Sequence, residues 1–400
     1  MKYDRSINQN QIHDRECADD GIIDLSVGDP QDPPPPQFYA AHRRRVVDGR
    51  ISHYPDPVGL LELRAAVSRQ YQDIWGMSLD PESDICVVNG ARGALQVALI
   101  AAERFGRPCG YVDPAYFGLP TAIRSAMMAP VPLRLEEVTS ADVDRVLKRL
   151  SGGLLVIVSP HNPTGRILTV AELERIKHAA RESDVKVVSD FVYKHLFSQT
   201  RPASFLELDA TAIEVSSFSK TFRVCGARCG YVAGKGEWIR KFRKIITDTQ
   251  NGVDPLTQMI MSDLLNDMSG VHEFRDSIVR RRDLLSRFLL RCGFEIQQYD
   301  NHGTNFVWAK NPLKAGSSSE IAARLEKANV RVLPGSALGS NGEGFTRFSL
   351  NYGEAVLERA GSRITAVMRP SRERYRHSSK RDRFARPALM DVPGNAAQTG

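Results

Sequence analysis

The sequence contains no run of about 18 consecutive apolar residues, the length that a membrane-spanning helix requires. Its first residues, MKYDRSINQNQ, are polar, and no apolar stretch follows them. We therefore predict neither a secretory signal peptide nor a membrane partner. No internal repeat is detectable either.

Cysteine is scarce: the 400 residues include six, irregularly spaced and without a Cys-x-x-Cys pair. This pattern argues against a disulfide framework and against a zinc site. We predict reduced thiols, a cytoplasmic location and no bound metal.

The net charge of +7 raises the question of a nucleic-acid partner. Much of the basic excess, however, lies in residues 369–400, a Pro- and Arg-rich tail without hydrophobic periodicity. Such a segment buries too little apolar surface to fold, so we predict a disordered, solvated tail. A nonspecific anionic partner for the tail is the alternative. For the whole chain we predict no nucleic-acid partner.

Short apolar runs alternate with helical patterns between about residues 84 and 235, which favours a parallel sheet covered on both faces. The runs are DICVV (84–88), CGYV (109–112), LLVIVS (154–159), VKVVS (185–189), AIEVSS (212–217) and CGYVAG (229–234). Thr169 and Glu172 form a capping-box pattern at the start of one intervening helix. In such sheets ligands bind beyond the carboxyl ends of the strands.

The remainder of the chain predicts a second, smaller unit. A long helical pattern at 275–296 is followed by shorter α+β units. We predict an N-terminal arm (1–19), a small domain (20–44 and 280–368), a large domain (45–279) and the tail (369–400).

Polar residues follow several of the predicted strands, and Lys220 is the most conspicuous of them. It lies in SSFSKTFRVCGARCGY (216–231). A buried lysine amine with a lowered pKa can form a Schiff base with an aldehyde. An aldehyde that carries a phosphate would need Arg228, the hydroxyls of Ser217 and Ser219, and backbone N–H groups at a helix start such as NGARGAL (89–95).

Other residues after the strands fit a flat heteroaromatic ring, although each also fits a purely structural role. Asp190 can receive a protonated ring nitrogen or cap a helix, and Tyr193 lies three residues on, on the same predicted helical face. Asn162 can bond a ring oxygen or form a turn. Tyr116 can stack on the ring or pack in the core. The Gly-rich loop also fits a plain tight turn. We assign no catalytic role to His161 or His195.

Together these residues resemble the class I/II aminotransferases, which are fold type I enzymes dependent on pyridoxal 5'-phosphate (PLP). The resemblance extends from about residue 20 to 368. Its most specific part is SFSKTFRVCGARCGY, similar to the family's Ser-x-Ser-Lys signature with an arginine eight residues after the lysine. HNPTG, SDFVY and YPDPVGLLELRAAV occur in the family's order and approximate spacing. The implied fold is a large domain with a mostly parallel seven-stranded sheet flanked by helices, plus a smaller α+β domain.

The resemblance also implies a role for each matching residue. Lys220 would form the Schiff base with PLP, Asp190 would keep the ring nitrogen protonated, and Tyr193 and Asn162 would bond the ring's phenolic oxygen. The phosphate would be held by Gly90, Ala91, Arg92, Ser217, Ser219 and Arg228, and Tyr116 would stack on the ring. Tyr54 would reach the neighbouring site of a homodimer. Arg347 would bind the substrate α-carboxylate, with Gly28 and Asn162 also at the substrate.

Some positions depart from the family pattern. Arg92 replaces a small polar residue, so we expect it to contact the phosphate through its backbone N–H. Cys225 and Cys229 flank the phosphate arginine and are assigned packing roles. Residues 245–262 carry no basic residue, whereas dicarboxylate-preferring members have an arginine in this region. The absence argues against an aspartate preference.

The implied activity is transfer of the α-amino group of an amino acid to a 2-oxo acid through the Lys220 Schiff base. Other PLP-dependent enzymes that remove the Cα proton share these residues, so an oxidase or hydroxylase such as an arginine oxidase, a cyclase, and a β/γ-eliminating enzyme are alternatives. A PLP-sensing transcriptional regulator is a further alternative. It is disfavoured because the resemblance starts near residue 20 and leaves no room for a helix-turn-helix.

Overall fold

The computed structural model describes residues 21–368 except 298 and 313–315. The predicted N-terminal arm and basic tail lie outside the described residues. No helix within the described ranges has the length and apolar character needed to cross a membrane.

The described residues form a sheet of seven strands in the order β2-β8-β7-β6-β5-β3-β4. All neighbouring strands are parallel except at β8, which is antiparallel to both β2 and β7. The strands are β2 (Ile85–Val88), β3 (Pro108–Val112), β4 (Ala129–Leu133), β5 (Leu154–Val158), β6 (Lys186–Asp190), β7 (Ile213–Ser217) and β8 (Gly230–Gly234). The predicted mostly parallel sheet is confirmed.

Sequence patterning missed strand β4, whose residues are APVPL. It pairs only with β3 and forms one edge of the sheet, where a proline that donates no hydrogen bond is tolerated. Because proline is rare in strands, Pro130 and Pro132 argued against a strand here, and the sequence pattern did not predict β4.

Helices cover both faces of the sheet, and the inner strands β5, β7 and β8 are buried along almost their whole length. One face packs against α3 (Ala91–Ala101), α4 (Leu119–Ser125) and α10 (Gly236–Thr249). The other face packs against α2 (Leu61–Trp75), α6 (Val143–Lys148), α7 (Val170–Glu182) and α11 (Pro255–Leu265). The predicted capping box is present: Thr169 Oγ1 accepts a hydrogen bond from Glu172 N, and Glu172 Oε2 accepts one from Thr169 N.

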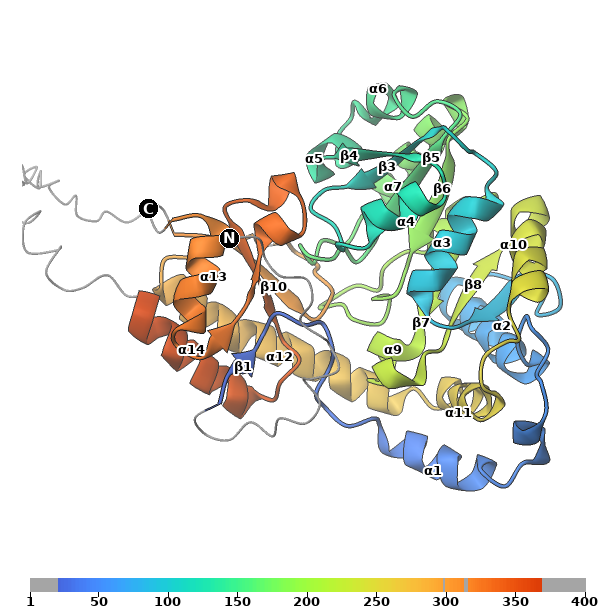
Figure 1. Ribbon diagram of the computed structural model, residues 1–400, viewed down its shortest axis with the longest axis horizontal. Coiled ribbons are helices and arrows are strands. Elements are labelled where there is room, and N and C mark those ends of the chain that lie inside the picture. The colour runs from blue at the N-terminus through green and yellow to red at the C-terminus, as the bar shows by residue number, and fades with distance from the viewer. Residues whose placement is uncertain (1–20, 298, 313–315, 369–400) are drawn as a thin grey trace, which may run out of the picture.

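A second group of elements surrounds a four-stranded sheet of order β12-β13-β10-β9 within the described residues. Figure 1 shows the long helix α12 (Ser269–Arg291) extending from α11 to α14 (Glu354–Met368). Ile23 and Leu25 pack into the core of this group, and β1 (Ile23–Asp24) pairs with β11 (Val330–Arg331). The N-terminal segment thus lies beside the second unit. The predicted boundary between residues 279 and 280 falls inside the continuous helix α12. The division of the chain into domains therefore stays a prediction.

The remaining elements are short or peripheral. Helix α1 (Pro36–Arg45) contributes Ala41 to the core that α2 and α11 share. The others are η2 (Gly49–Ser52), α5 (Leu135–Thr139), α8 (Phe205–Leu208), α9 (Phe218–Thr221), η3 (Cys225–Ala227), β9 (Glu295–Ile296), β10 (Phe306–Lys310), α13 (Ser318–Glu326), β12 (Leu333–Pro334), η4 (Gly335–Ala337), η5 (Ser340–Gly342) and β13 (Phe345–Ser349).

Candidate active site

Three of the predicted site residues, Asp190, Ser217 and Lys220, lie at the carboxyl edge of the large sheet. Asp190 is the last residue of β6, and Ser217 is the last residue of the adjacent parallel strand β7. Lys220 follows three residues later in the short helix α9. Isolated bridges from Arg166 to His302 and from Phe197 to Gly303 join the loops after β5 and β6 to the segment before β10.

The Lys220 amine is held by two contacts. Its Nζ donates a hydrogen bond to the carbonyl oxygen of Gly28 at 2.7 Å and lies 3.4 Å from Cys225 Sγ. Gly28, which we predicted at the substrate, thus lies beside the Lys220 amine. The packing role that we assigned to Cys225 was incomplete, because its thiol contacts the amine. Cys229 is buried, as a packing residue would be.

A cradle for an anion forms where the loop after β2 meets the segment after α9. A Cβ atom built on Gly90 would lie 2.6 Å from Arg228 Nη2, and Gly90 has a φ of +81°. Only glycine therefore lets the guanidinium lie against this loop without strain. Ser217 Oγ accepts from Ser219 N and donates to Ser219 Oγ at 2.9 Å. Ala91 begins α3, whose first N–H groups have no partner within the helix.

The Arg92 side chain lies against two aromatic rings. Its guanidinium carbon lies 5.0 Å from the centroid of the Tyr116 ring and 5.9 Å from that of the Phe117 ring. The contact is a cation–π interaction that supports Tyr116. The side chain is thus engaged with aromatic rings, in line with an anion contact through the backbone alone.

Asp190, Tyr193 and Tyr116 lie within electrostatic range of one another. Burial raises the pKa of Tyr116, with Arg92 and Arg228 acting against the rise and Asp190 adding to it. Burial also raises the pKa of Tyr193 well above its usual value; Arg347 opposes this, and Asp190 and Tyr116 add to it. Residues from four separate loops therefore share one site.

The predicted helix that would place Tyr193 above Asp190 is absent. Residues 192–195 form a turn, in which Lys194 N bonds the carbonyl of Phe191 and Leu196 N bonds that of Tyr193. These bonds span three residues rather than the four of an α-helix, so the chain bends back after Tyr193. The helical prediction was wrong, although the two side chains still share the site.

The half-buried Asp190 at the end of β6 gives a stability prediction. Burial raises its pKa from 3.8 to about 6. Because the folded value exceeds the unfolded one, the cost of burying the charge is absent below the unfolded pKa, grows between about pH 4 and about pH 6, and is constant above that. We expect Asp190→Asn to raise the unfolding free energy of the cofactor-free protein by about 2 kcal/mol at pH 8 and by less at pH 5.

Urea unfolding of wild type and Asp190→Asn at the two pH values measures this effect. An equal gain at pH 5 and pH 8 would show that the charge of Asp190 is not the cause.

Arg347 closes the site from the second unit. It is 6% exposed and lies on β13. Its Nη1 donates to Asn162 Oδ1 at 3.0 Å, and its Nη2 donates to the carbonyl of Ser26 at 2.6 Å. Asn162 Nδ2 in turn lies 3.5 Å from the hydroxyl of Tyr193. Burial lowers the pKa of Arg347 to about 10, so the guanidinium stays charged at neutral pH.

Two buried polar atoms at the site have no hydrogen-bond partner among the described residues: the hydroxyl oxygen of Tyr116 and Nε of Arg347. Leaving a buried polar group unpaired costs roughly 1–3 kcal/mol. Both atoms therefore indicate that the site receives a polar ligand.

Tyr54 is not brought to this site within the chain. Its side chain is 86% exposed. The contact predicted for it requires a second subunit.

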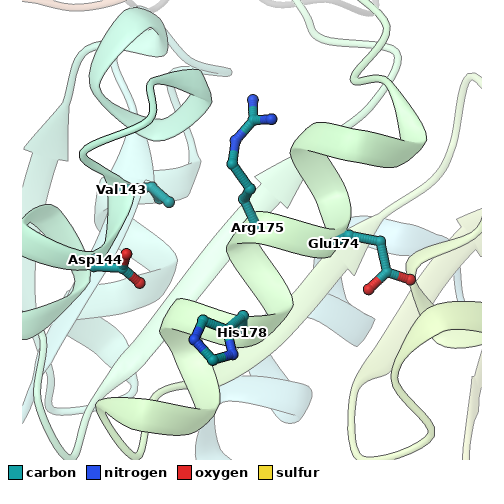
Figure 2. A pocket seen from close by; sticks show the side chains of 5 residues that line it. All are labelled: Val143, Asp144, Glu174, Arg175 and His178. Carbon is teal, nitrogen blue, oxygen red and sulfur yellow. The ribbon is translucent and has the colours of Figure 1, made fainter.

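A groove of about 280 Å³ lies elsewhere, between α6 and α7 (Figure 2). Its lining residues are Val143, Asp144, Glu174, Arg175 and His178. Arg175 donates to the carbonyl of Thr139, and Glu174 pairs with Lys177, so both charges already have partners. Figure 2 shows that the Arg175 and Glu174 side chains point in different directions. The groove contains none of the predicted site residues, and we assign it no chemistry.

Comparison with known proteins gives a consistent assignment. The profile of the family "Aminotransferase class I and II" matches residues 20–364. An aspartate aminotransferase of Pyrococcus abyssi is 32% identical, with 87% of this chain and 92% of that protein covered. An LL-diaminopimelate aminotransferase of Dehalococcoides mccartyi is 26% identical, covering 88% of this chain and 93% of that protein.

Solved structures agree with the sequence relatives. The crystal structure of an aromatic aminotransferase from Pyrococcus horikoshii superimposes with a TM-score of 0.81 at 30% identity. The match covers 88% of this chain and 96% of that one. The chain therefore belongs to the class I and II aminotransferase family and is an amino-acid aminotransferase.

Proposed function

We propose that this aminotransferase works with PLP bound covalently through Lys220 Nζ. The observation that carries the proposal is the convergence of the Lys220 amine, the Arg228 guanidinium against Gly90 and the half-buried Asp190 carboxyl at neighbouring strand ends. When bound, PLP supplies an electron-withdrawing ring that stabilises negative charge at the substrate α-carbon.

The residues present fit this cofactor. Arg228, the hydroxyls of Ser217 and Ser219, and the start of α3 at Ala91 would hold the phosphate. The Arg228 guanidinium can lie against the start of α3 because Gly90 has no side chain. The Tyr116 ring, whose hydroxyl has no partner among the described residues, lies 5.0 Å from the Arg92 guanidinium carbon at the start of α3.

Asp190 would face the ring nitrogen, and Tyr193 with Asn162 would face the ring oxygen. A carboxylate beside the nitrogen favours its protonated form. The elevated pKa of Asp190 describes the cofactor-free site, where no cation offsets the burial of its charge. Pairing with a protonated nitrogen would return the carboxyl to its ionised form.

Lys220 Nζ would accept the proton from the substrate α-carbon as a general base. Arg347 would orient the substrate by binding its α-carboxylate, for which a planar guanidinium can provide two parallel hydrogen bonds. Its Nε has no partner among the described residues and is one donor for that purpose.

The substrates would be an amino acid and a 2-oxo acid. The relatives' names differ in the amino acid, from aspartate to LL-diaminopimelate. The absence of a basic residue in 245–262 argues against aspartate. A screen of amino donors, followed by the loss of absorbance of the bound PLP, identifies the preferred class.

Rapid mixing tests the reaction. PLP-loaded protein mixed with an amino donor alone should produce pyridoxamine phosphate and 2-oxo acid in equal amounts, without oxygen uptake. Release of ammonia with oxygen consumption would overturn transamination in favour of oxidation. Failure of the purified protein to retain PLP would overturn the cofactor assignment.

We also propose a homodimer in which Tyr54 of each subunit completes the partner's site. The exposure of this tyrosine supports the proposal. One hydrogen bond to a phosphate contributes roughly 1.5–3 kcal/mol, so we expect Tyr54→Phe to raise the Kd for PLP by about 10- to 100-fold. Tyr39→Phe is the control, because this tyrosine is also exposed but has no assigned role.

Subunit hybrids separate a contact across the dimer from a contact within one chain. Mixing Tyr54→Phe with Lys220→Ala subunits at limiting PLP should give active hybrids, because each hybrid dimer regains one intact site. Inactive hybrids, with dimer exchange demonstrated, would contradict the shared site.

The cytoplasmic location stays a prediction, and it is supported by the five described cysteines, which are all free.

A further inference from the structure

Residues 28–36, here named the strap, form a segment whose first residue, Gly28, contacts Lys220. Arg281, which is 6% exposed, binds both carboxylate oxygens of Asp32 at 2.7 and 2.5 Å. Arg223 Nε donates to the carbonyl of Pro33 at 2.7 Å. The strap is therefore fixed to α12 and to the segment that follows Lys220.

The first residues of the strap reach the Lys220 amine. Gly28 accepts its hydrogen bond directly. Asp29 reaches it through a second residue, because its carboxylate is hydrogen-bonded to the Cys225 thiol, and Cys225 Sγ lies 3.4 Å from Nζ. The side chains of Asp29, Cys225 and Lys220 thus follow one another in a row.

The protonation of this row follows from its surroundings. Burial raises the pKa of Cys225 to about 11; Lys220 acts to lower it, and Asp29 acts to raise it. The thiol is consequently neutral at physiological pH. A neutral thiol has one S–H, for which the Ser219 carbonyl at 3.6 Å and the Asp29 carboxylate are both acceptors, and its sulfur accepts a hydrogen bond from the Lys220 amine.

We propose that Cys225 and Asp29 are positioning residues for Lys220, with Asp29 orienting the thiol and Cys225 Sγ fixing the amine whenever Nζ is not bonded to the cofactor. The inference rests on the proposed role of Lys220. A lysine side chain has high rotamer entropy, so fixing its amine lowers the cost of reaching the reactive geometry. The contact between Cys225 Sγ and Lys220 Nζ should therefore affect kcat, and not the binding of substrate or cofactor, because it positions the amine that accepts the proton.

The first test uses cofactor-free protein and needs no activity. The rate of Cys225 alkylation by iodoacetamide, measured by peptide mass spectrometry, gives the pH midpoint of the thiol. The groups that face it are Lys220, Asp29 and Tyr193, and Arg228 Nη1 binds its carbonyl. We expect Asp29→Asn to lower the midpoint by about one pH unit and Lys220→Met to raise it.

Buried Cys86 and Cys109 are internal controls in the same digest, and their reactivity should not change between variants. A Cys225 midpoint that neither substitution moves would overturn the row of contacts.

The second test measures turnover of the PLP-loaded enzyme. Cys225→Ala should lower kcat about tenfold while KM and PLP affinity change less than about twofold, and Cys225→Ser should recover most of the loss. Cys229→Ala is the matched control, because this neighbouring thiol is buried without contacting Lys220. An unchanged kcat in Cys225→Ala, or equal losses in the Ala and Ser variants, would refute the positioning role. Absence of PLP binding in the wild type would instead refute the proposed function.

Discussion

Replacing Lys220 with alanine should lower kcat by about 10⁴-fold or more, because the substitution removes both the covalent attachment and the general base. The protein should still fold and still bind PLP without a covalent bond, since Arg228, Ser217 and the start of α3 are unchanged. Steady-state turnover with a 2-oxo acid acceptor measures the loss.

The control for this substitution is Lys244→Ala, a lysine on α10 whose side chain is 77% exposed and whose partner is Asp248 on the same helix. It should leave kcat unchanged. If Lys220→Ala keeps more than about a tenth of the wild-type kcat, the amine is not the base.

Replacing Arg347 with alanine should lower kcat/KM by about 10³-fold, mainly through KM. Two charge-assisted hydrogen bonds to a carboxylate contribute roughly 3–5 kcal/mol together, and each 1.4 kcal/mol is a factor of ten. The variant also leaves Asn162 Oδ1 without its donor, which loosens the contact of Asn162 with Tyr193. Steady-state kinetics across amino donors measures the loss.

Arg347→Lys is the informative comparison. It keeps a positive charge but loses the planar fork, so we expect a smaller loss of about 10²-fold. PLP affinity should be the same in both variants. A loss confined to kcat, with KM unchanged, would contradict a role in binding the α-carboxylate.

Site residues that end or directly follow a strand could be predicted from the sequence pattern more readily than residues whose partners are distant in the sequence. Asp190 and Ser217 end neighbouring parallel strands, so the strand pattern alone places them at one edge. The spacing of Lys220 and Arg228 is local, and the structure brings both to that edge. Arg347 could be singled out only through the family resemblance, because its partners Asn162 and Ser26 are far away in the sequence.

Other features depend on tertiary contacts that no local pattern reports. Residues 192–195 form a turn from which Lys194 enters the core, where it contacts the hydroxyl of Tyr231 and lies over the rings of Tyr71 and Trp75. The contact of Cys225 with Lys220 arises from the short helices α9 and η3. From the sequence alone, a cysteine five residues after a lysine can equally pack in the core or contact the lysine amine. No local pattern distinguishes the two.

The measurement that tests the central claim most directly is the position of the cofactor bond. The protein is incubated with PLP, reduced with borohydride, digested and mapped by mass spectrometry. The account predicts one modified site per chain, at Lys220, and no stoichiometric modification in Lys220→Ala. Modification spread over surface lysines, or stoichiometric modification of a different lysine, would contradict it.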